Sequence, residues 1–230
     1  MLISSLFPRL NIGLTRFSLL VFTVILSLSL LLFVVAAEAA EPLFDDFFIA
    51  LRNGNAAEVK AWLEKGGDAN ILDKQGETPL MLAVRFDDNQ AVVNLLLRAG
   101  AKSYVRNRYG ETALMLAVFH GRPRSVTALL DGGTDIGEAN RMGWTPLIYA
   151  AFAGHTAIAE QLLAYGAPVD SSSDNGFTAL MMAARNGHFE TVKLLLAKGA
   201  DRSRKNSAGL TARDMALNKG DSDIAGLLTP

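Results

Sequence analysis

Apolar residues recur along this chain in short blocks that alternate with polar turns. Stretches such as VVNLLLRAG, IAEQLLAYG and TVKLLLAKG place leucines on one face of a helix and then end in glycine. Glycine suits the left-handed position just past a helix end, so each stretch predicts one helix and its stop. We expect the leucines to form the buried stripe of that helix, at Leu95, Leu96, Leu129, Leu130, Leu162, Leu163, Leu194 and Leu195.

A second apolar block opens another helix. It reads GETPLMLA, GETALMLA, GWTPLIYA, GFTALMMA and GLTARDMA, and its threonine can cap a helix start through the side-chain oxygen. Pro79 and Pro146 fit the first helical position, where a missing N–H costs no hydrogen bond. Small residues follow where neighbouring helices must approach closely, at Ala83, Ala117, Ala150 and Ala183.

The second block recurs at an almost fixed spacing. It begins at Gly76, Gly110, Gly143, Gly176 and Gly209, in steps of 34, 33, 33 and 33 residues. The helix-ending glycine always stands ten residues ahead of the block, so the one extra residue falls in the turn around Asp87, Asp88 and Asn89. A period of this size predicts a row of small stacked units rather than one globular core.

These blocks and glycines resemble the ankyrin repeat, whose pattern has a G-x-T-P-L start, a first helix, a Gly-His turn, a second helix ending in L-L-x-x-G-A, and a β-hairpin finger. The resemblance covers about residues 42–230. It implies an all-α solenoid of about six stacked helix pairs with short fingers. The first unit has lost the threonine and the last is short and polar, as expected of caps. The expected units are 42–75, 76–109, 110–142, 143–175, 176–208 and 209–230.

One departure from the family pattern is systematic. The histidine that follows T-P-L in the family is replaced by Met81, Met115, Ile148 and Met181. An apolar side chain can preserve the packing at this position but not the hydrogen bond. We therefore expect the fold to be kept and its polar network to differ.

Residues 1–39 have a different composition. After two arginines, an uncharged run begins at Phe17 and leads to an A-x-A site at Ala37–Ala39. This order predicts a signal peptide and a mature chain that begins near Ala40. The alternative is an uncleaved membrane anchor, because a helix over residues 17–35 would rise roughly 28 Å, close to the hydrocarbon thickness of about 30 Å. Both interpretations place the repeats outside the cytoplasm.

Composition narrows the classes of function. The chain has no cysteine, which excludes disulfides, thiolate catalysis and cysteine zinc sites. Secreted eukaryotic modules commonly carry disulfides, so we expect an exported ankyrin-repeat protein of a bacterial periplasm. The formal net charge of −1 gives no reason to expect a nucleic acid as partner.

No arrangement of residues predicts catalysis, a metal or a cofactor. His155 and His188 occupy the Gly-His turn, where the family uses histidine structurally, and a metal between them would lack a third ligand. His120 and Glu111 are the best acid–base candidates, but the spacing supplies no third group to orient them. We therefore expect a protein that is not an enzyme.

The predicted binding surface is the concave face made by the finger tips and the exposed side of the first helices. Aromatic side chains gather there in the middle units, flanked by arginines, a composition typical of interface centres. Trp144 stands where the two preceding units have Glu77 and Glu111. The alternative is that the rings cover one another. The expected partner-binding residues are Arg108, Tyr109, Phe119, Arg141, Met142, Trp144, Phe152 and Phe177.

The resemblance implies a non-catalytic protein–protein interaction module, because the family works by binding. A narrower alternative is an inhibitor, an immunity protein or a protective accessory protein of a periplasmic enzyme. Another is a membrane-tethered scaffold that retains residues 17–35. In each case the partner is another protein, the membrane is contacted only through that segment, and the capped ends favour a monomer.

Overall fold

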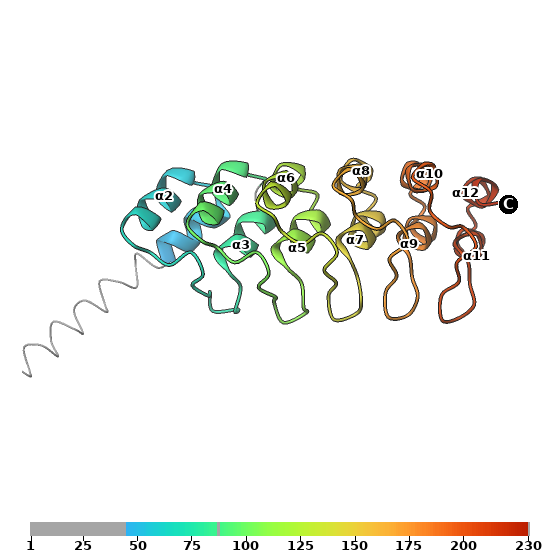
Figure 1. The fold of residues 1–230 in the computed structure, drawn as a ribbon, viewed down its shortest axis with the longest axis horizontal. Coiled ribbons are helices and arrows are strands. Elements are labelled where there is room, and N and C mark those ends of the chain that lie inside the picture. The colour runs from blue at the N-terminus through green and yellow to red at the C-terminus, as the bar shows by residue number, and fades with distance from the viewer. Residues whose placement is uncertain (1–44, 87, 230) are drawn as a thin grey trace, which may run out of the picture. The chain divides into compact units, whose positions relative to one another are not determined.

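The computed structural model describes residues 45–86 and 88–229, which form paired helices joined by turns and loops (Figure 1). The chain is helical over residues 45–52. The helices that follow are α2 (Ala56–Glu64), α3 (Pro79–Phe86), α4 (Gln90–Arg98), α5 (Ala113–Phe119), α6 (Pro123–Asp131), α7 (Pro146–Ala153), α8 (Thr156–Ala164), α9 (Ala179–Asn186), α10 (Phe189–Ala197), α11 (Ala212–Lys219) and α12 (Ser222–Leu227).

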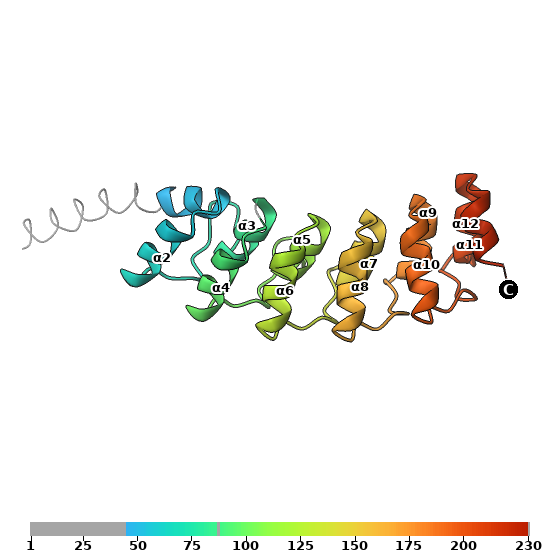
Figure 2. The same cartoon turned by 90° about the horizontal axis from the view of Figure 1, so that it is seen from above.

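The helices lie in two layers within the compact unit that begins at Phe47. First helices contact one another in chain order from α3 through α5, α7 and α9 to α11, and second helices do so from α2 to α12. Figures 1 and 2 show the pairs side by side in one row, and in Figure 1 the finger loops all project below the first helices. Packing between neighbouring pairs is the arrangement of a solenoid, so the expected all-α architecture is confirmed.

Threonine caps begin the first helices, as predicted. The Oγ1 atoms of Thr112, Thr145 and Thr178 each accept a hydrogen bond from the backbone N–H three residues on, at 3.3 to 3.5 Å. Thr211 forms a full capping box, because the carboxylate of Asp214 also accepts a hydrogen bond from the backbone N–H of Thr211. Both prolines of this motif hold the first position of their helices, α3 and α7. The local sequence rule therefore fixes where each first helix starts.

The first helices carry much of the core. The four small residues predicted at close approaches, at 83, 117, 150 and 183, are at most 3% exposed. Met81, Met115, Ile148 and Met181 are at most 1% exposed, so the apolar residues that replace the family histidine pack inside. Their packing is kept, as predicted.

The leucine stripe of the second helices is narrower than predicted. Leu96, Leu129, Leu162 and Leu195 are fully buried, and Leu130 is 8% exposed. The prediction is wrong for three others, which are only half-buried because one step along a helix turns a side chain by about 100°. These three are Leu95, Leu163 and Leu194.

The extra residue of unit 76–109 lies in the turn between its two helices, as the spacing predicts. The second helix starts seven residues after Ala83, at Gln90, whereas in the next unit α6 starts six residues after Ala117. Asn89 caps α4, because its Oδ1 accepts from the N–H of Ala91 at 3.0 Å. Asp87 itself lies outside the described residues.

Each finger is closed by one polar side chain three residues ahead of its glycine. In one finger, Oδ1 of Asn107 accepts hydrogen bonds from the N–H groups of Tyr109 and Glu111, at 2.9 and 3.0 Å. The same position is occupied by acceptors in the other fingers, which are Asp73, Asn140, Ser173 and Asn206. Backbone bonds close the same loops, such as that from the N–H of Asn107 to the carbonyl of Glu111 at 2.9 Å, so side chain and backbone together hold each finger.

The expected β-hairpins are hydrogen-bonded turns rather than paired strands. Over the described ranges the chain forms no strand, only an isolated antiparallel bridge between Ser172 and Thr178. The fingers that begin at Asn107, Asn140, Ser173 and Asn206 are each joined to the next by one backbone bond, such as that from the N–H of Arg141 to the carbonyl of Tyr109 at 3.3 Å. Too few backbone bonds are made to form a strand, but they keep neighbouring fingers in register.

The turn within a pair is tied to the preceding unit. Nε2 of His155 lies 3.2 Å from the carbonyl oxygen of Phe119, and Nε2 of His188 lies 3.0 Å from that of Phe152. Carbonyls in the last turn of a helix lack a partner within it, and here the next unit supplies one. Arg122 does the same for the end of α3. The structural role expected of both histidines is confirmed.

The predicted signal peptide or anchor, residues 1–39, lies outside the described residues, and so does the start of the first unit at residues 42–44. In residues 45–86 and 88–229, no helix is both long and apolar enough to cross a membrane. The unit boundaries and the number of six units stay predictions. Phe47 does pack on the next helix, since the rings of Phe47 and Trp62 stack at 4.8 Å.

We expect Gly154→Ala to destabilise the fold more than Gly166→Ala. Both glycines have positive φ, 73° and 91°, so alanine at either position costs about 1–2 kcal/mol. A Cβ on Gly154 would lie 2.5 Å from Nδ1 of His188, whereas nothing lies within 4 Å of a Cβ on Gly166. Displacing the His188 ring adds a loss of about 1 kcal/mol for its hydrogen bond. Urea unfolding of both variants measures the difference in unfolding free energy.

A second substitution serves as the control. Adding His188→Ala to Gly154→Ala should cost little more, because the displaced ring has already lost its bond to the carbonyl of Phe152. Equal losses for the two glycine variants would contradict the contact between units.

Candidate functional site

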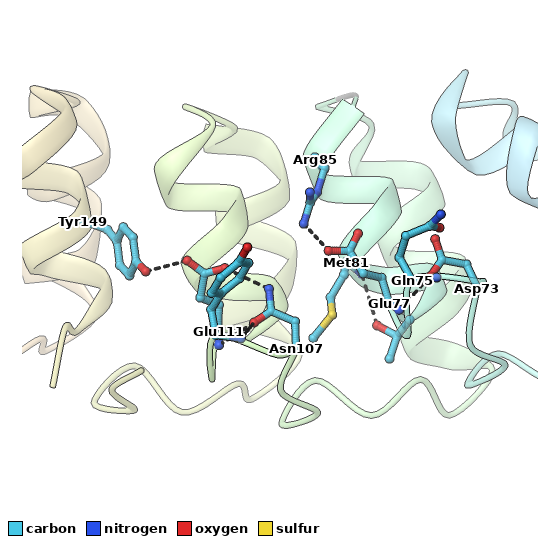
Figure 3. A network of polar contacts seen from close by, with 10 residues as sticks. Asp73, Gln75, Glu77, Met81, Arg85, Asn107, Glu111 and Tyr149 are labelled. Carbon is cyan, nitrogen blue, oxygen red and sulfur yellow. Dashed lines mark hydrogen bonds and ion pairs between the residues drawn. The ribbon is translucent and has the colours of Figure 1, made fainter. Parts of the chain in front are cut away.

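Glu111 joins two units through a polar network. Its Oε1 accepts a hydrogen bond from the hydroxyl of Tyr149 at 2.6 Å, and its Oε2 accepts one from Nδ2 of Asn107 at 2.8 Å. The hydroxyl of Tyr149 in turn accepts a bond from Nδ2 of Asn140 at 2.8 Å. Figure 3 shows Tyr149 reaching from α7 toward the carboxylate in the preceding unit. The network therefore ties α7 to the finger base of unit 110–142.

The Tyr149 hydroxyl is a permanent donor in this network. Its ring is 6% exposed. Burial, and after it the hydrogen bond to Glu111, raise the pKa of Tyr149 well above its ordinary value. The hydroxyl thus keeps its proton over the physiological pH range, and the bond between the units is kept with it.

Two aromatic side chains contact the Tyr149 ring, and a third contacts one of these two. The ring centroids of Trp144 and Phe119 lie 5.3 and 5.9 Å from that of Tyr149, at interplanar angles of 66° and 75°. Phe152 lies 5.2 Å from Trp144. Aromatic pairs attract at such separations and tilted angles. We call Phe119, Trp144, Tyr149 and Phe152 the aromatic cluster.

One ring of the aromatic cluster is buried, and the other three are partly accessible to solvent. Tyr149 is buried, Trp144 and Phe152 are half-buried, and Phe119 is 41% exposed. The alternative that the rings cover one another thus describes part of this surface. Trp144 is not sealed inside the core, so it remains available to a partner.

The other predicted residues lie on the fingers and the segments next to them. Tyr109 and Met142 are each 56% exposed. Cζ of Arg108 lies 4.9 Å from the ring centroid of Tyr109, and Arg141 bonds to the carbonyl of Tyr109 from the next finger. Phe177 is half-buried and, within the described part of the chain, stacks on no other ring. Seven of the eight therefore lie on three adjacent units, and Phe177 lies one unit further on.

One pair of positions recurs on this surface, namely the residue before the threonine cap and the residue eight places later. In unit 76–109 the pair is Glu77 and Arg85, which form an ion pair (Figure 3). In unit 143–175 the same positions hold Trp144 and Phe152, which form an aromatic contact. In these two units the backbone thus brings the same two positions together, and the residues at them decide the chemistry of the contact.

A hollow of about 200 Å³ lies beside the Glu77–Arg85 pair. Its walls come from Arg52 and Phe86 on one side and from Arg108 and Tyr109 on the other. Burial raises the pKa of Glu77, although the neighbouring Arg85 acts to lower it. The ion pair therefore does not fully offset the loss of water around the carboxylate.

The candidate acid–base pair is not assembled for catalysis. The carboxylate of Glu111 is engaged by Tyr149 and Asn107 rather than by His120. Burial, followed by the charges of Arg85 and Arg122, lowers the pKa of His120 and favours its neutral form. No group of three metal-ligating side chains occurs in residues 45–86 and 88–229.

Two residues of this surface, Tyr149 and Arg52, were not predicted from the sequence. The sequence does contain a signal for Tyr149, because the register of the repeats places it where other units have Leu82, Leu116 and Met182. A hydroxyl at an otherwise apolar position needs a buried partner. Arg52 belongs to the first unit, whose opening block does not follow the pattern, so the repeat register gave it no position on the surface.

The family described as Ankyrin repeats (3 copies) matches residues 47–140, 124–206 and 169–229. Together these matches span most of the chain, which therefore belongs to the ankyrin-repeat family. Proteins of this family are generally protein–protein interaction modules and are typically not catalytic. No curated protein matches the chain at a significant level.

Tyr149→Phe should lower the free energy of unfolding by about 1–3 kcal/mol, because the carboxylate of Glu111 and the amide of Asn140 lose a buried partner. The matched control is Tyr165→Phe. The Tyr165 hydroxyl also donates to a carboxylate in the preceding unit, Asp131, at 2.6 Å, but on an exposed surface. We expect no measurable change in the unfolding free energy of the Tyr165→Phe variant. A similar loss of unfolding free energy in both variants, measured in urea, would contradict the importance of burial.

Proposed function

We propose that this protein is a non-catalytic binding module that holds another protein outside the cytoplasm. The partner contacts the surface formed by the aromatic cluster and the adjacent fingers. The observation that carries the proposal is the position of Trp144, which packs on Tyr149 and Phe152 and yet remains partly open to solvent. Large aromatic side chains held in place by a buried neighbour are typical of interface centres.

The rim of this surface supports the same proposal. Arg108 and Arg141 flank the rings on two neighbouring fingers, and Met142 adds an adaptable apolar side chain. Tryptophan, tyrosine and arginine are the residues that most often carry binding energy. An inhibitor, an immunity protein and a protective accessory protein of a periplasmic enzyme would all use such a surface, since each acts by holding a partner.

Trp144→Ala combined with Phe152→Ala should abolish partner capture. Loss of two central aromatic anchors costs about 2 kcal/mol or more of binding free energy, or at least about thirtyfold in affinity. The measurement is crosslinking of the protein in intact cells, followed by identification of the captured partner and titration of that partner against both forms.

The control is Tyr165→Ala with Phe189→Ala, which removes two exposed rings from the second-helix layer. This variant should capture the partner normally. Circular dichroism must show that both double variants retain their helices. A folded Trp144/Phe152 variant that keeps the partner would refute the proposed surface.

The proposed location has its own test. If residues 1–39 are a signal peptide, the exported protein should begin near Ala40, because signal peptidase cuts after a small-residue A-x-A site. N-terminal sequencing of the protein from the periplasmic fraction measures this directly. A protein that keeps its N-terminus and fractionates with membranes would instead support the tethered scaffold, and a protein found in the cytoplasm would contradict both.

A further inference from the structure

Two arginines beside the hollow lie over aromatic rings. Cζ of Arg108 is 4.9 Å from the ring centroid of Tyr109, and Cζ of Arg52 is 5.9 Å from that of Phe86. A guanidinium that lies over a ring is attracted by the electrons of the ring face. Its N–H groups point outward in the guanidinium plane, so this contact leaves them free to bind an acceptor.

No carboxylate in the described part of the chain binds these two arginines. The ion pairs found there on this face involve other residues, notably Arg85 with Glu77. Neither Arg52 nor Arg108 makes an ion pair within 4.0 Å or a side-chain hydrogen bond in residues 45–86 and 88–229. Both arginines are exposed, so their donors are free to bind an acceptor from outside the described residues.

The nearby carboxylates are committed elsewhere. Asp73 accepts the backbone N–H groups of Gln75 and Glu77 at 2.9 and 2.8 Å, which closes its finger. Glu111 accepts the bonds of Tyr149 and Asn107. The hollow itself has three arginines against two carboxylates. Its charge is positive, although the whole chain is close to neutral.

The positive surface continues toward the aromatic cluster. Arg141 lies against the preceding finger, where a Cβ on Gly110 would come within 2.8 Å of its Cγ. It is exposed and forms no ion pair in the described ranges. Arg52, Arg108 and Arg141 thus follow one another over three consecutive units, from the hollow toward Trp144. We call these three residues the arginine row.

We infer that the partner presents an acidic segment, whose carboxylates bind the arginine row while an apolar side chain of the same segment contacts the aromatic cluster. The inference rests on the proposed function and narrows the chemistry of its partner. Carboxylate and guanidinium form paired hydrogen bonds of matching geometry. Complementary charge also accelerates association and selects against basic partners.

The test uses the protein in the form that the cell produces and a defined probe. The probe is a short fluorescent peptide in which Glu and Ser alternate around a central Phe, and its control has every Glu replaced by Gln. Fluorescence anisotropy should show that the Glu peptide binds about tenfold more tightly or better than the Gln peptide. Its affinity should fall as salt rises. Failure of the Glu peptide to bind at about 1 mM would overturn the inference.

Two matched variants locate the binding. Arg52→Gln with Arg108→Gln should weaken the Glu peptide about tenfold or more. Arg98→Gln with Lys198→Gln removes the same charge from exposed ends of the second helices and should leave binding unchanged. The affinity of the variant with Arg52→Lys and Arg108→Lys should lie between that of the unchanged protein and that of the glutamine variant. Lysine keeps the charge but lacks the planar guanidinium that pairs with a carboxylate. Equal effects of the two charge-removing variants would overturn the inference.

A second probe separates carboxylates from anions in general. A single-stranded oligothymidylate that binds as tightly as the Glu peptide, and weakens in the same arginine variant, would mean that the row recognises polyanions and would overturn the assignment to a protein partner. Weak oligonucleotide binding beside strong Glu peptide binding supports it.

Failure of this inference is distinguishable from failure of the proposed function. If the partner captured in cells is lost in the Trp144/Phe152 variant but retained in the Arg52/Arg108 variant, the acidic segment is wrong and the binding surface stands. If both variants lose the partner, both proposals hold.

Discussion

Stacking of each helix pair on the next is the interaction on which the rest of this structure depends. Helices of eight or nine residues, such as α7 and α8, are too short to be stable alone in water. Their neighbours supply the missing apolar contact, and Ala117 and Ala150, both fully buried, allow the first helices to approach closely. Stability is therefore shared along the row, and a residue that sets the distance between units affects more than its own unit.

Hydrogen bonds between units give this stacking a fixed register. Apolar surfaces tolerate sliding, whereas a bond to a particular carbonyl does not. His155, His188 and Arg122 all donate to the end of the preceding first helix, so the position requires a donor rather than one residue type. Asp221 at the equivalent place in the last unit has no donor when ionised, and it caps α12 instead. Within the described residues, this bond is therefore missing between the pair α9–α10 and the pair α11–α12.

Much of this fold could be predicted because it follows local rules. Threonine caps, glycines with positive φ and buried alanines are each specified by the residue and its place in the period. Leu95, Leu163 and Leu194 were misplaced because a repeated Leu-Leu pair does not show which member faces the neighbouring helix. Tyr149 was missed because its partner lies in another unit, 38 positions away.

The same division between fixed and variable positions explains how such a surface arises. Stacking and caps determine the backbone, so the pair of positions held by Glu77 and Arg85 in one unit can hold Trp144 and Phe152 in another. Partly exposed rings forfeit some burial energy in the free protein. Tyr149 limits that cost by packing against Trp144, and rings already held in place lose little conformational freedom on binding. An anchored aromatic surface is therefore better suited to gripping a partner than a flexible one of equal area.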